Sequence, residues 1–351
     1  MKSNMTLNEL AAEITRQAEQ RKDYIAPTDK LRPVVVAEQD VYLGGMNGQA
    51  LPLTDHAHGQ MATSLGIPMR YYRRMQAEEP TLLAHNIDTW LRKQGDRVMV
   101  RTLDGQVRAI MSDKYQPFDH NLMLNAALPA LHEAGRNMEI TSLVLTDRRM
   151  YLQVVDHRRE GEVKPGDVVR AGFVLSNSEI GEGAFSMEDM VWRLVCSNGL
   201  VQGKALNRYH VGRRAETGED GVAYAADTQR ADAQALLLKL RDTLQHVLSP
   251  EAFERRLLTL REAAGMQITR PLTEVVEVTA KQLTLNESEA NNVLQFLARG
   301  GDFSKWGLVN AITRTAQEVD GDRAYELERA AGGVIEMSQG DWGEYFMKKA
   351  A

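Results

Sequence analysis

The periodicity of the apolar residues changes along this 351-residue chain, and this change constrains the fold more than any other feature of the sequence. Between residues 97 and 215, short apolar runs alternate with turn residues, and two of these runs flank the dipeptide Asp104-Gly105. Such runs predict antiparallel strands joined by hairpins. From residue 232 onward, apolar residues recur at helical spacing. The sequence therefore predicts an α+β fold, with a mixed, mainly antiparallel sheet and helices, followed by a helical C-terminal region.

The same changes in pattern divide the chain into four segments. We expect helices and a short β-ribbon in residues 1–96 and an α+β core in residues 97–215. The stretch 216–231 is polar and contains glycine, which predicts a loop or linker, and residues 232–351 are expected to be helical.

One helix is expected near the end of the core. Ser186 can cap this helix, and Glu188 and Asp189 place acidic groups in its first turn, as the helix dipole favours. Met190, Val191 and Leu194 would belong to its apolar face.

Cysteine occurs once, at Cys196, which excludes a disulfide framework and any zinc site built from several thiolates. A lone cysteine fits a reducing compartment, so we expect a cytoplasmic protein. The first residues lack the apolar run of a secretory signal, and no later stretch approaches about 18 consecutive apolar residues. We therefore expect no association with a membrane.

The sequence indicates no metal ion, cofactor or catalytic residue. His56 and His58 would point about 200° apart on the helix expected there, so they cannot share an ion. Phosphate-binding lysine loops, paired Cys-x-x-Cys motifs and nucleophile elbows do not occur in the sequence. We therefore expect a protein that binds its ligand without transforming it.

The net charge is −6, but the basic residues are unevenly distributed, and residues 190–215 contain no acidic residue. The basic residues of this stretch are Arg193, Lys204, Arg208, Arg213 and Arg214. Together with Tyr209, they form the mixture of cations and aromatic rings that holds the backbone of a single strand and stacks its bases. Arg148 and Arg149, at a predicted hairpin end, would extend this track. The alternative is a solvated basic face, with Arg193 held by a carboxylate such as Glu179 or Asp167.

Two polar strings, Asn177-Ser178-Glu179 and Asn198-Gly199, adjoin apolar segments. Side chains of these types often bond to the backbone in turns, which predicts buried turn architecture. The alternative is that Asn177 and Asn198 contact a bound ligand.

Residues 54–75 have the outline of a helix–turn–helix. Gly66 can end the first helix, and the second would carry Arg70, Arg73 and Arg74, in the position from which base edges are read in duplex DNA. The alternative is a pair of helices that only packs against the rest of the protein.

Several strings together resemble one known family. They are Leu65-Gly66-Ile67-Pro68, Ser112-Asp113-Lys114-Tyr115, Ser176-Asn177-Ser178-Glu179 with Gly181, Arg193-Leu194-Val195-Cys196-Ser197-Asn198-Gly199-Leu200, and Glu326-Leu327-Glu328-Arg329-Ala330-Ala331-Gly332. They resemble the family catalogued as domain of unknown function 932, over most of residues 50–340. Members of that family are carried by phages, plasmids and integrating elements. Their order of hairpin, helix and further sheet is similar in outline to the single-strand annealing superfamily.

The resemblance and the basic segment together suggest a non-enzymatic DNA-metabolism protein of a mobile element. We expect it to bind single-stranded DNA or to anneal strands in recombination, and to form a homo-oligomer, because annealing needs adjacent binding sites. One alternative is a metal-dependent nucleic-acid enzyme that uses carboxylates such as Asp119, Asp167 and Glu179. Another is a regulatory adaptor that binds duplex DNA or a host protein through residues 54–75.

Overall fold

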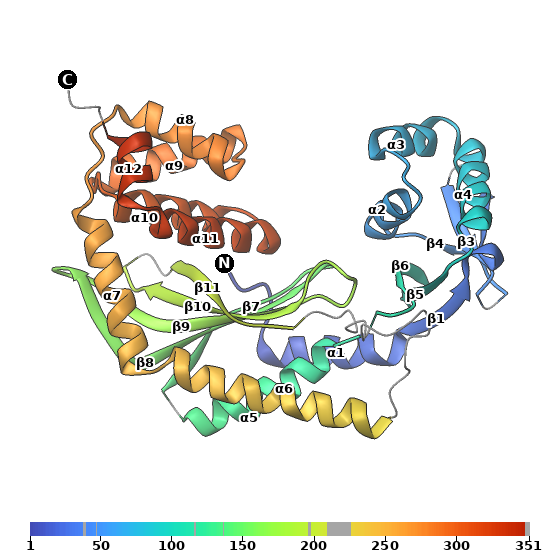
Figure 1. Ribbon diagram of the computed structural model, residues 1–351, viewed down its shortest axis with the longest axis horizontal. Coiled ribbons are helices and arrows are strands. Elements are labelled where there is room, and N and C mark those ends of the chain that lie inside the picture. The colour runs from blue at the N-terminus through green and yellow to red at the C-terminus, as the bar shows by residue number, and fades with distance from the viewer. Residues whose placement is uncertain are drawn as a thin grey trace.

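The computed structural model describes residues 1–37, 40–46, 48–115, 117–135, 137–195, 198–208 and 226–347. Figure 1 shows two lobes that rise from a common base and face each other across a gap. The smaller lobe is formed by N-terminal residues, and the larger lobe by a long sheet with the C-terminal helices above it.

The smaller lobe contains two small antiparallel sheets and three α-helices with a core of their own. Its strands are β1 (Lys22–Pro27), β2 (Arg32–Val36), β3 (Asp40–Gly44), β4 (Leu51–Pro52), β5 (Arg97–Leu103) and β6 (Gln106–Ser112). Its helices are η1 (Thr28–Lys30), α2 (Asp55–Ser64), α3 (Met69–Glu78) and α4 (Pro80–Gln94). The strand orders are β1-β5-β6 and β2-β3-β4. Leu31, Met61, Tyr72 and Leu83 lie in its buried core.

The β5–β6 hairpin turns at Asp104-Gly105, as the sequence predicts. Both residues have positive φ, 51° and 74°, which matches the twist of a two-residue hairpin turn. On its other side, β5 pairs with β1, which precedes it by about 70 residues. This pairing joins the first segment of the chain to the start of the expected core.

The larger lobe is built on a five-stranded antiparallel sheet whose strands follow one another in chain order. They are β7 (Met138–Leu145), β8 (Met150–Lys164), β9 (Asp167–Asn177), β10 (Phe185–Arg193) and β11 (Asn198–Arg208). Three helices lie along one face of this sheet (Figure 1): α1 (Leu7–Gln20), α5 (His120–Ala134) and α6 (Ala226–Val247). Because C-terminal helices cover the other face, the central strand β9 is buried along most of its length.

The C-terminal region is helical, as predicted. Its elements are α7 (Pro250–Gly265), α8 (Leu272–Leu283), α9 (Glu287–Gly300), α10 (Lys305–Thr315), η2 (Ala316–Glu318), α11 (Gly321–Glu336) and α12 (Gln339–Phe346). Helix α11 lies so close to β11 that a Cβ atom at Gly332 would overlap the carbonyl oxygen of Val201. Within the ranges given above, no helix combines the length and apolar character needed to cross a bilayer.

The α+β class with a helical C-terminal region is confirmed, but one predicted helix is wrong. Ser186 does not cap a helix, because residues Phe185–Arg193 form β10, between β9 and β11. The Ser186 hydroxyl instead pairs with that of Ser176 on β9, at 2.8 Å. A short apolar run that is buried on both faces cannot be distinguished from a helix by periodicity alone.

The division of the chain into segments stays a prediction. Helix α6 begins at Ala226, inside the stretch 216–231 that is expected to be a linker, and residues 216–225 lie outside the described residues.

Candidate nucleic-acid interface

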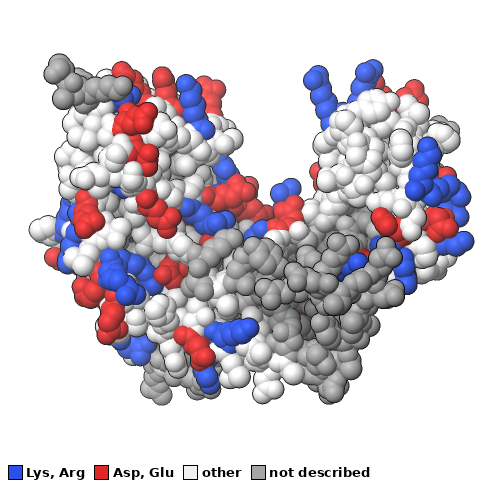
Figure 2. Space-filling model, in the orientation of Figure 1, with Lys and Arg blue, Asp and Glu red and all other residues white. Residues whose placement is uncertain are grey.

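An open cleft separates the two lobes and is visible as a hollow in the surface (Figure 2). Two pockets of about 410 and 450 Å³ lie side by side there, and Asp147 and Arg148 line both of them. These two residues form the turn between β7 and β8, at one end of the five-stranded sheet. The sheet end is therefore the floor of the cleft.

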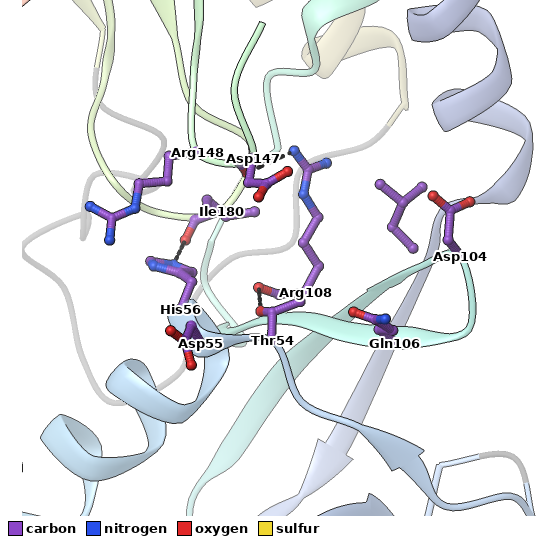
Figure 3. Close-up of a pocket in the computed structure, with 10 residues that line it drawn as sticks. Thr54, Asp55, His56, Asp104, Gln106, Arg108, Asp147, Arg148 and Ile180 are labelled. Carbon is purple, nitrogen blue, oxygen red and sulfur yellow. Dashed lines mark hydrogen bonds between the residues drawn. The ribbon is translucent and has the colours of Figure 1, made fainter. Parts of the chain in front are cut away.

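The first pocket, which we call the interlobe pocket, lies between the turn and the smaller lobe (Figure 3). Its lining includes Asp55 and His56 from the first turn of α2, and Gln106 and Arg108 from β6. The His56 ring lies 3.0 Å from the Ile180 carbonyl oxygen, so it ties α2 to the β9–β10 loop. The interlobe pocket thus combines hydrogen-bond donors and acceptors from both lobes.

The second pocket, which we call the acidic pocket, lies between the same turn and the start of α11. Asp320, Asp322 and Glu326 line it on the helical side. The Asp322 carboxylate accepts hydrogen bonds from the Tyr151 hydroxyl at 2.8 Å and from the Thr146 hydroxyl at 3.1 Å. Carboxylates dominate this pocket, which makes it a poor surface for a polyanion.

The cations predicted to hold nucleic acid gather at opposite ends of the sheet. Arg148 and Arg149 lie in the turn at the cleft, and the register pairs Arg208 with Phe185 at the same end. Arg193 pairs with Asn198 at the far end of the nine-residue strand β10, roughly 26 Å away. A single strand would therefore need a long path to touch all of these residues.

The described members of this set already have partners. Arg193 donates from Nε to Asp167 at 2.6 Å, and the other oxygen of this carboxylate accepts the Trp306 indole N–H at 2.8 Å. Asp167 is one of the two carboxylates named for Arg193 in the alternative interpretation. Arg149 donates to the Glu182 carbonyl oxygen. Arg148 is the most accessible of the three, with 56% of its side chain exposed and a loose 3.7 Å ion pair to Glu182.

The remaining predicted cations cannot be placed in this way. Lys204 and Arg208 lie on β11, and their side chains are outside the described part of the structure. Tyr209, Arg213 and Arg214 lie outside the described residues altogether. Nucleic-acid binding by this set stays a prediction.

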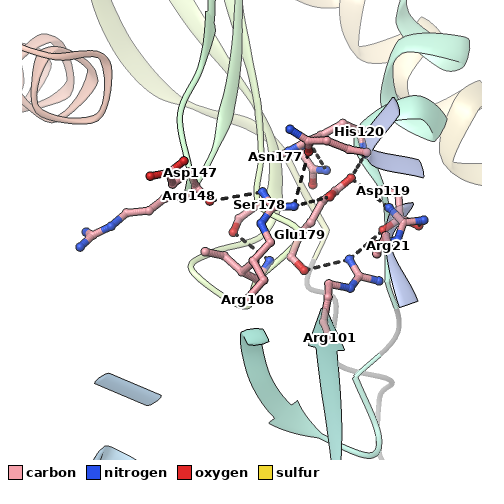
Figure 4. Close-up of polar contacts among 12 residues, drawn as sticks. Arg21, Arg101, Arg108, Asp119, His120, Asp147, Arg148, Asn177, Ser178 and Glu179 are labelled. Atoms are coloured by element: carbon pink, nitrogen blue, oxygen red, sulfur yellow. Dashed lines mark hydrogen bonds and ion pairs between the residues drawn. The ribbon is translucent and has the colours of Figure 1, made fainter. Parts of the chain in front are cut away.

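A buried cluster of charges joins the two lobes and shares Arg108 with the interlobe pocket (Figure 4). At its centre, the Glu179 carboxylate is held by Arg108 at 3.1 Å, by the backbone N–H of His120 at 2.7 Å and by Arg21 at 3.5 Å. Burial alone would raise the pKa of Glu179, but the His120 ring and N–H, together with Arg108 and Arg21, lower it to about 2. Glu179 is therefore a structural anion, ionised at any physiological pH.

Arg101 extends the same cluster and is fully buried. It makes a bidentate pair with Asp23 at 2.7 and 2.8 Å and donates to Asp119 at 2.9 Å. It also donates to the backbone carbonyl oxygen of Glu179 at 2.9 Å. Arg101 and Arg108 come from the smaller lobe, whereas Asp119 and Glu179 belong to the segments around the sheet. Since breaking one partner of a buried pair is costly, these contacts fix the lobes to each other.

His120 lies beside Glu179 but is neutral at physiological pH, because burial lowers its pKa to about 4. Its Nδ1 lies 3.1 Å from Nδ2 of Asn177 and so accepts a hydrogen bond, which leaves the ring proton on Nε2. Asn177 also donates to the Phe118 carbonyl oxygen at 2.7 Å. The polar string at 177–179 thus organises the interior of the protein.

The residues of both polar strings lie inside the structure. Ser178 accepts from the backbone N–H groups of Ile180 and Glu182 within the loop. Asn198 donates to the Thr313 hydroxyl of α10, and a side chain at Gly199 would collide with Met190. The arrangement corresponds to turn architecture, since ligand contact by Asn177 or Asn198 would require these buried side chains to be exposed.

Of the three carboxylates considered for metal-dependent chemistry, only Asp119 and Glu179 lie close together, and arginines occupy both of them. Asp119 and Glu179 are paired with arginines in the buried cluster, and Asp167 is paired with Arg193 at the other end of the sheet. Within the described residues, there is no group of three or more histidine, cysteine, aspartate or glutamate side chains that could hold a metal ion.

The two helices expected in residues 54–75 form as α2 and α3. His58 is buried and bonds to the Tyr72 hydroxyl at 2.8 Å, so it packs the two helices together. Arg73 pairs with Asp55 and Arg74 with Glu78, whereas Arg70 is exposed on α3. This helix pair therefore has both a packing role and an exposed basic side.

Four residues that no pattern in the sequence singled out are central in the structure. Arg21, Asp23, Arg101 and Arg108 form the buried cluster together with residues distant in the chain. One signal was present: Arg101 and Arg108 interrupt predicted strands at positions where apolar residues would be expected.

Comparison with known proteins gives one result. Neither the curated proteins nor the solved structures contain a match to this chain. Residues 108–331, which make up well over half of the chain, match the family described as Domain of unknown function (DUF932). The chain therefore belongs to this family.

Proposed function

We propose that this protein binds single-stranded DNA in the cleft between its lobes, as a DNA-metabolism protein of a mobile element that acts in strand binding or annealing. The observation that carries the proposal is the position of Arg148, an exposed arginine on the cleft floor between two pockets. An arginine of this kind can contact phosphate from the floor of a groove.

The ion pair of Arg148 does not oppose this role. At 3.7 Å and with more than half of the arginine side chain in water, its link to Glu182 is worth about 1 kcal/mol or less. A phosphate can therefore replace Glu182 as its partner at little cost. The carboxylates of the acidic pocket would repel a phosphate backbone, so the proposed path follows the α2 side of the cleft.

The test is the binding of fluorescently labelled strands of about 30 nucleotides, single-stranded or as a duplex, followed by anisotropy. We expect the single strand to bind more tightly and its affinity to fall steeply as salt rises from about 50 to 200 mM. In Arg148→Ala, single-strand affinity should fall several-fold and the salt slope should decrease by about one unit, as for the loss of one phosphate contact.

Two further variants complete the experiment. Arg241 is a matched control, because it is an exposed arginine on α6 with an equally superficial partner, Asp242. Its replacement by Ala should leave affinity unchanged. Replacing Arg208, Arg213 and Arg214 together by Ala should weaken binding further than Arg148→Ala. Wild-type affinity in both the Arg148 variant and the triple variant would refute the proposed interface.

A second candidate is duplex DNA or a host protein bound through residues 54–75, within the smaller lobe. It is favoured by the exposed side of α3, where Arg70 and Tyr71 face solvent. In the same assay, preference for the duplex, lost in Arg70→Ala and kept in Arg148→Ala, would select this candidate instead.

A further inference from the structure

The interlobe pocket contains a carboxylate whose charge acts on nearby Arg108 but whose oxygens, among the described residues, make no hydrogen bond or ion pair. Among the described residues, the side-chain oxygens of Asp147 make no hydrogen bond and no ion pair, although the backbone carbonyl of Asp147 accepts from Arg108 at 3.2 Å. The other carboxylates of the pocket are engaged: Asp55 pairs with Arg73, and Asp104 with Arg16. Asp147 is therefore the acceptor that the pocket offers to a ligand.

The donors of the pocket lie beside this acceptor. Arg108 is held in place by Glu179 and by the Asp147 carbonyl, so its guanidinium is fixed at the pocket wall (Figure 3). Arg148 follows Asp147 directly, and its mostly exposed side chain lines the pocket as well. Leu103 and Ile180 add apolar surface. The pocket thus presents a carboxylate, guanidinium groups and apolar side chains within one space of about 410 Å³.

Simple ions do not suit this lining. A phosphate prefers donors alone, but it would meet the Asp147 carboxylate in the pocket. A cation would meet Arg108 and Arg148. A flat, uncharged group that has both donors and acceptors on its edge matches the lining better, and the volume lies within the range of small-molecule pockets, about 300–1,000 Å³.

Among the bases of DNA, guanine fits best. It is the base with two adjacent N–H groups on its pairing edge, N1–H and the exocyclic amine, which a carboxylate can accept together. Its O6 and N7 acceptors, on the neighbouring edge, are those that arginine contacts most often. Adenine and cytosine each offer a carboxylate one amino group, and thymine offers one ring N–H. Unpaired bases in single strands expose these edges for recognition.

We infer that the interlobe pocket takes one unpaired guanine base of a bound strand, with Asp147 accepting from its N1–H and amino group and Arg108 donating to its O6 or N7. This inference rests on the proposed function, and it adds a base preference to a contact that would otherwise be indifferent to sequence. Asp147 and Arg108 would be the residues that determine specificity.

The experiment uses the full-length chain and labelled oligothymidine strands that differ at one central position. This position carries guanine, thymine, 7-deazaguanine, which lacks N7, or hypoxanthine, which lacks the exocyclic amine. We expect the guanine strand to bind about 5- to 150-fold more tightly than the thymine strand. Hypoxanthine should lose most of this preference.

Two variants connect the preference to the pocket. Asp147→Asn should abolish the discrimination between guanine and thymine without weakening the binding of the thymine strand, because an amide cannot accept from both N–H groups. Glu326→Gln removes the same charge from the acidic pocket and should keep the preference. Both residues lie on the surface, so neither variant is expected to affect folding.

The outcomes separate the two proposals. Tight, salt-dependent binding of all strands without a guanine preference would overturn the guanine pocket and leave the proposed function intact. If no strand binds, the proposed function fails. The guanine pocket is then tested separately, by measuring the binding of free guanosine at millimolar concentration with saturation-transfer NMR. Guanosine that fails to bind, or binds equally to wild type and Asp147→Asn, would overturn the inference.

Discussion

Replacing Glu179, the anion at the centre of the buried cluster of charges, is expected to destabilise the protein more than any change of a surface residue in the same loop. Glu179 is only 2% exposed and holds two arginines, Arg108 and Arg21, together with the backbone N–H of His120. The variant Glu179→Gln keeps the shape of the side chain and removes its charge. Arg108, with only 7% of its side chain exposed, then stays buried without a carboxylate.

The magnitude follows from the cost of leaving a buried arginine without its carboxylate. Breaking a buried ion pair by removing one partner costs about 3–5 kcal/mol. Independently, the pKa of Glu179 is lowered from 4.5 to about 2, because its partners outweigh the effect of burial. The lowered pKa has the same sign, because it shows that the folded protein favours the ionised form of Glu179. We therefore expect the free energy of unfolding to fall by about 3–5 kcal/mol at pH 7.

The measurement is urea unfolding at pH 7, followed by circular dichroism, with Glu182→Gln as the matched control. Glu182 lies on the same loop, but its side chain is 29% exposed and pairs with His56 and Arg148 near the surface. Its loss should cost about 1 kcal/mol or less. The reasoning is refuted if Glu179→Gln is no more destabilising than Glu182→Gln.

The same variant tests the sign of the pH dependence. Because the folded-state pKa of Glu179 is lowered, its stabilisation is present above pH 4.5 and is lost as the pH falls toward 2. Glu179→Gln should lack this part of the acid destabilisation. If the free energy of unfolding falls with pH below 4.5 as steeply in the variant as in the wild type, Glu179 contributes nothing to the acid destabilisation.

Three further outcomes are expected in the same unfolding assay. Gly332→Ala should lower the free energy of unfolding by about 1–3 kcal/mol, because its methyl group would overlap the Val201 carbonyl oxygen. Gly333→Ala is the control: the space around Gly333 is open, so this variant should be neutral or stabilising by up to about 1 kcal/mol. Equal effects of the two variants would contradict the close packing of α11 on β11. The wild-type protein should lose stability as the pH falls from 6.5 toward 4, because burial lowers the pKa of His120 to about 4. His120→Gln should reduce this dependence of the free energy of unfolding on pH. An unchanged dependence would exclude His120 as its source. Trp306→Phe should cost about 1–3 kcal/mol by leaving an oxygen of Asp167 without its donor, and a neutral effect would show that this hydrogen bond is dispensable.

Local signals in the sequence predicted much of the fold. The dipeptide Asp104-Gly105 forms the expected hairpin turn. Capping boxes are equally local: Thr6 with Glu9 begins α1, and Asn286 with Glu289 begins α9. These features depend on residues within one turn of each other, so the sequence alone determines them.

The parts that could not be predicted depend on long-range pairing. Ser186 lies in a strand because β9 and β11 flank it, and its local pattern fits a helix equally well. Glu179 meets Arg108 and Arg21 across separations of 71 and 158 residues, so nothing in their spacing reveals the contact. For Arg193 the sequence leaves two carboxylates open, Glu179 and Asp167, and only the pairing of β9 with β10 places Asp167 beside it.

The position of the buried cluster has a practical consequence for the design of truncated forms of this protein. The range that matches the family begins at residue 108, inside β6, so it omits β5 and all of β1. A polypeptide limited to residues 108–331 would lack Arg21 and Arg101, leaving Asp119 without either of its arginines and Glu179 with Arg108 as its one remaining arginine. We expect such a fragment to aggregate or unfold. The matched range therefore shows that the chain is related to the family, but it does not mark the limits of a stable fragment. A truncated protein made for experiments should begin upstream of α1.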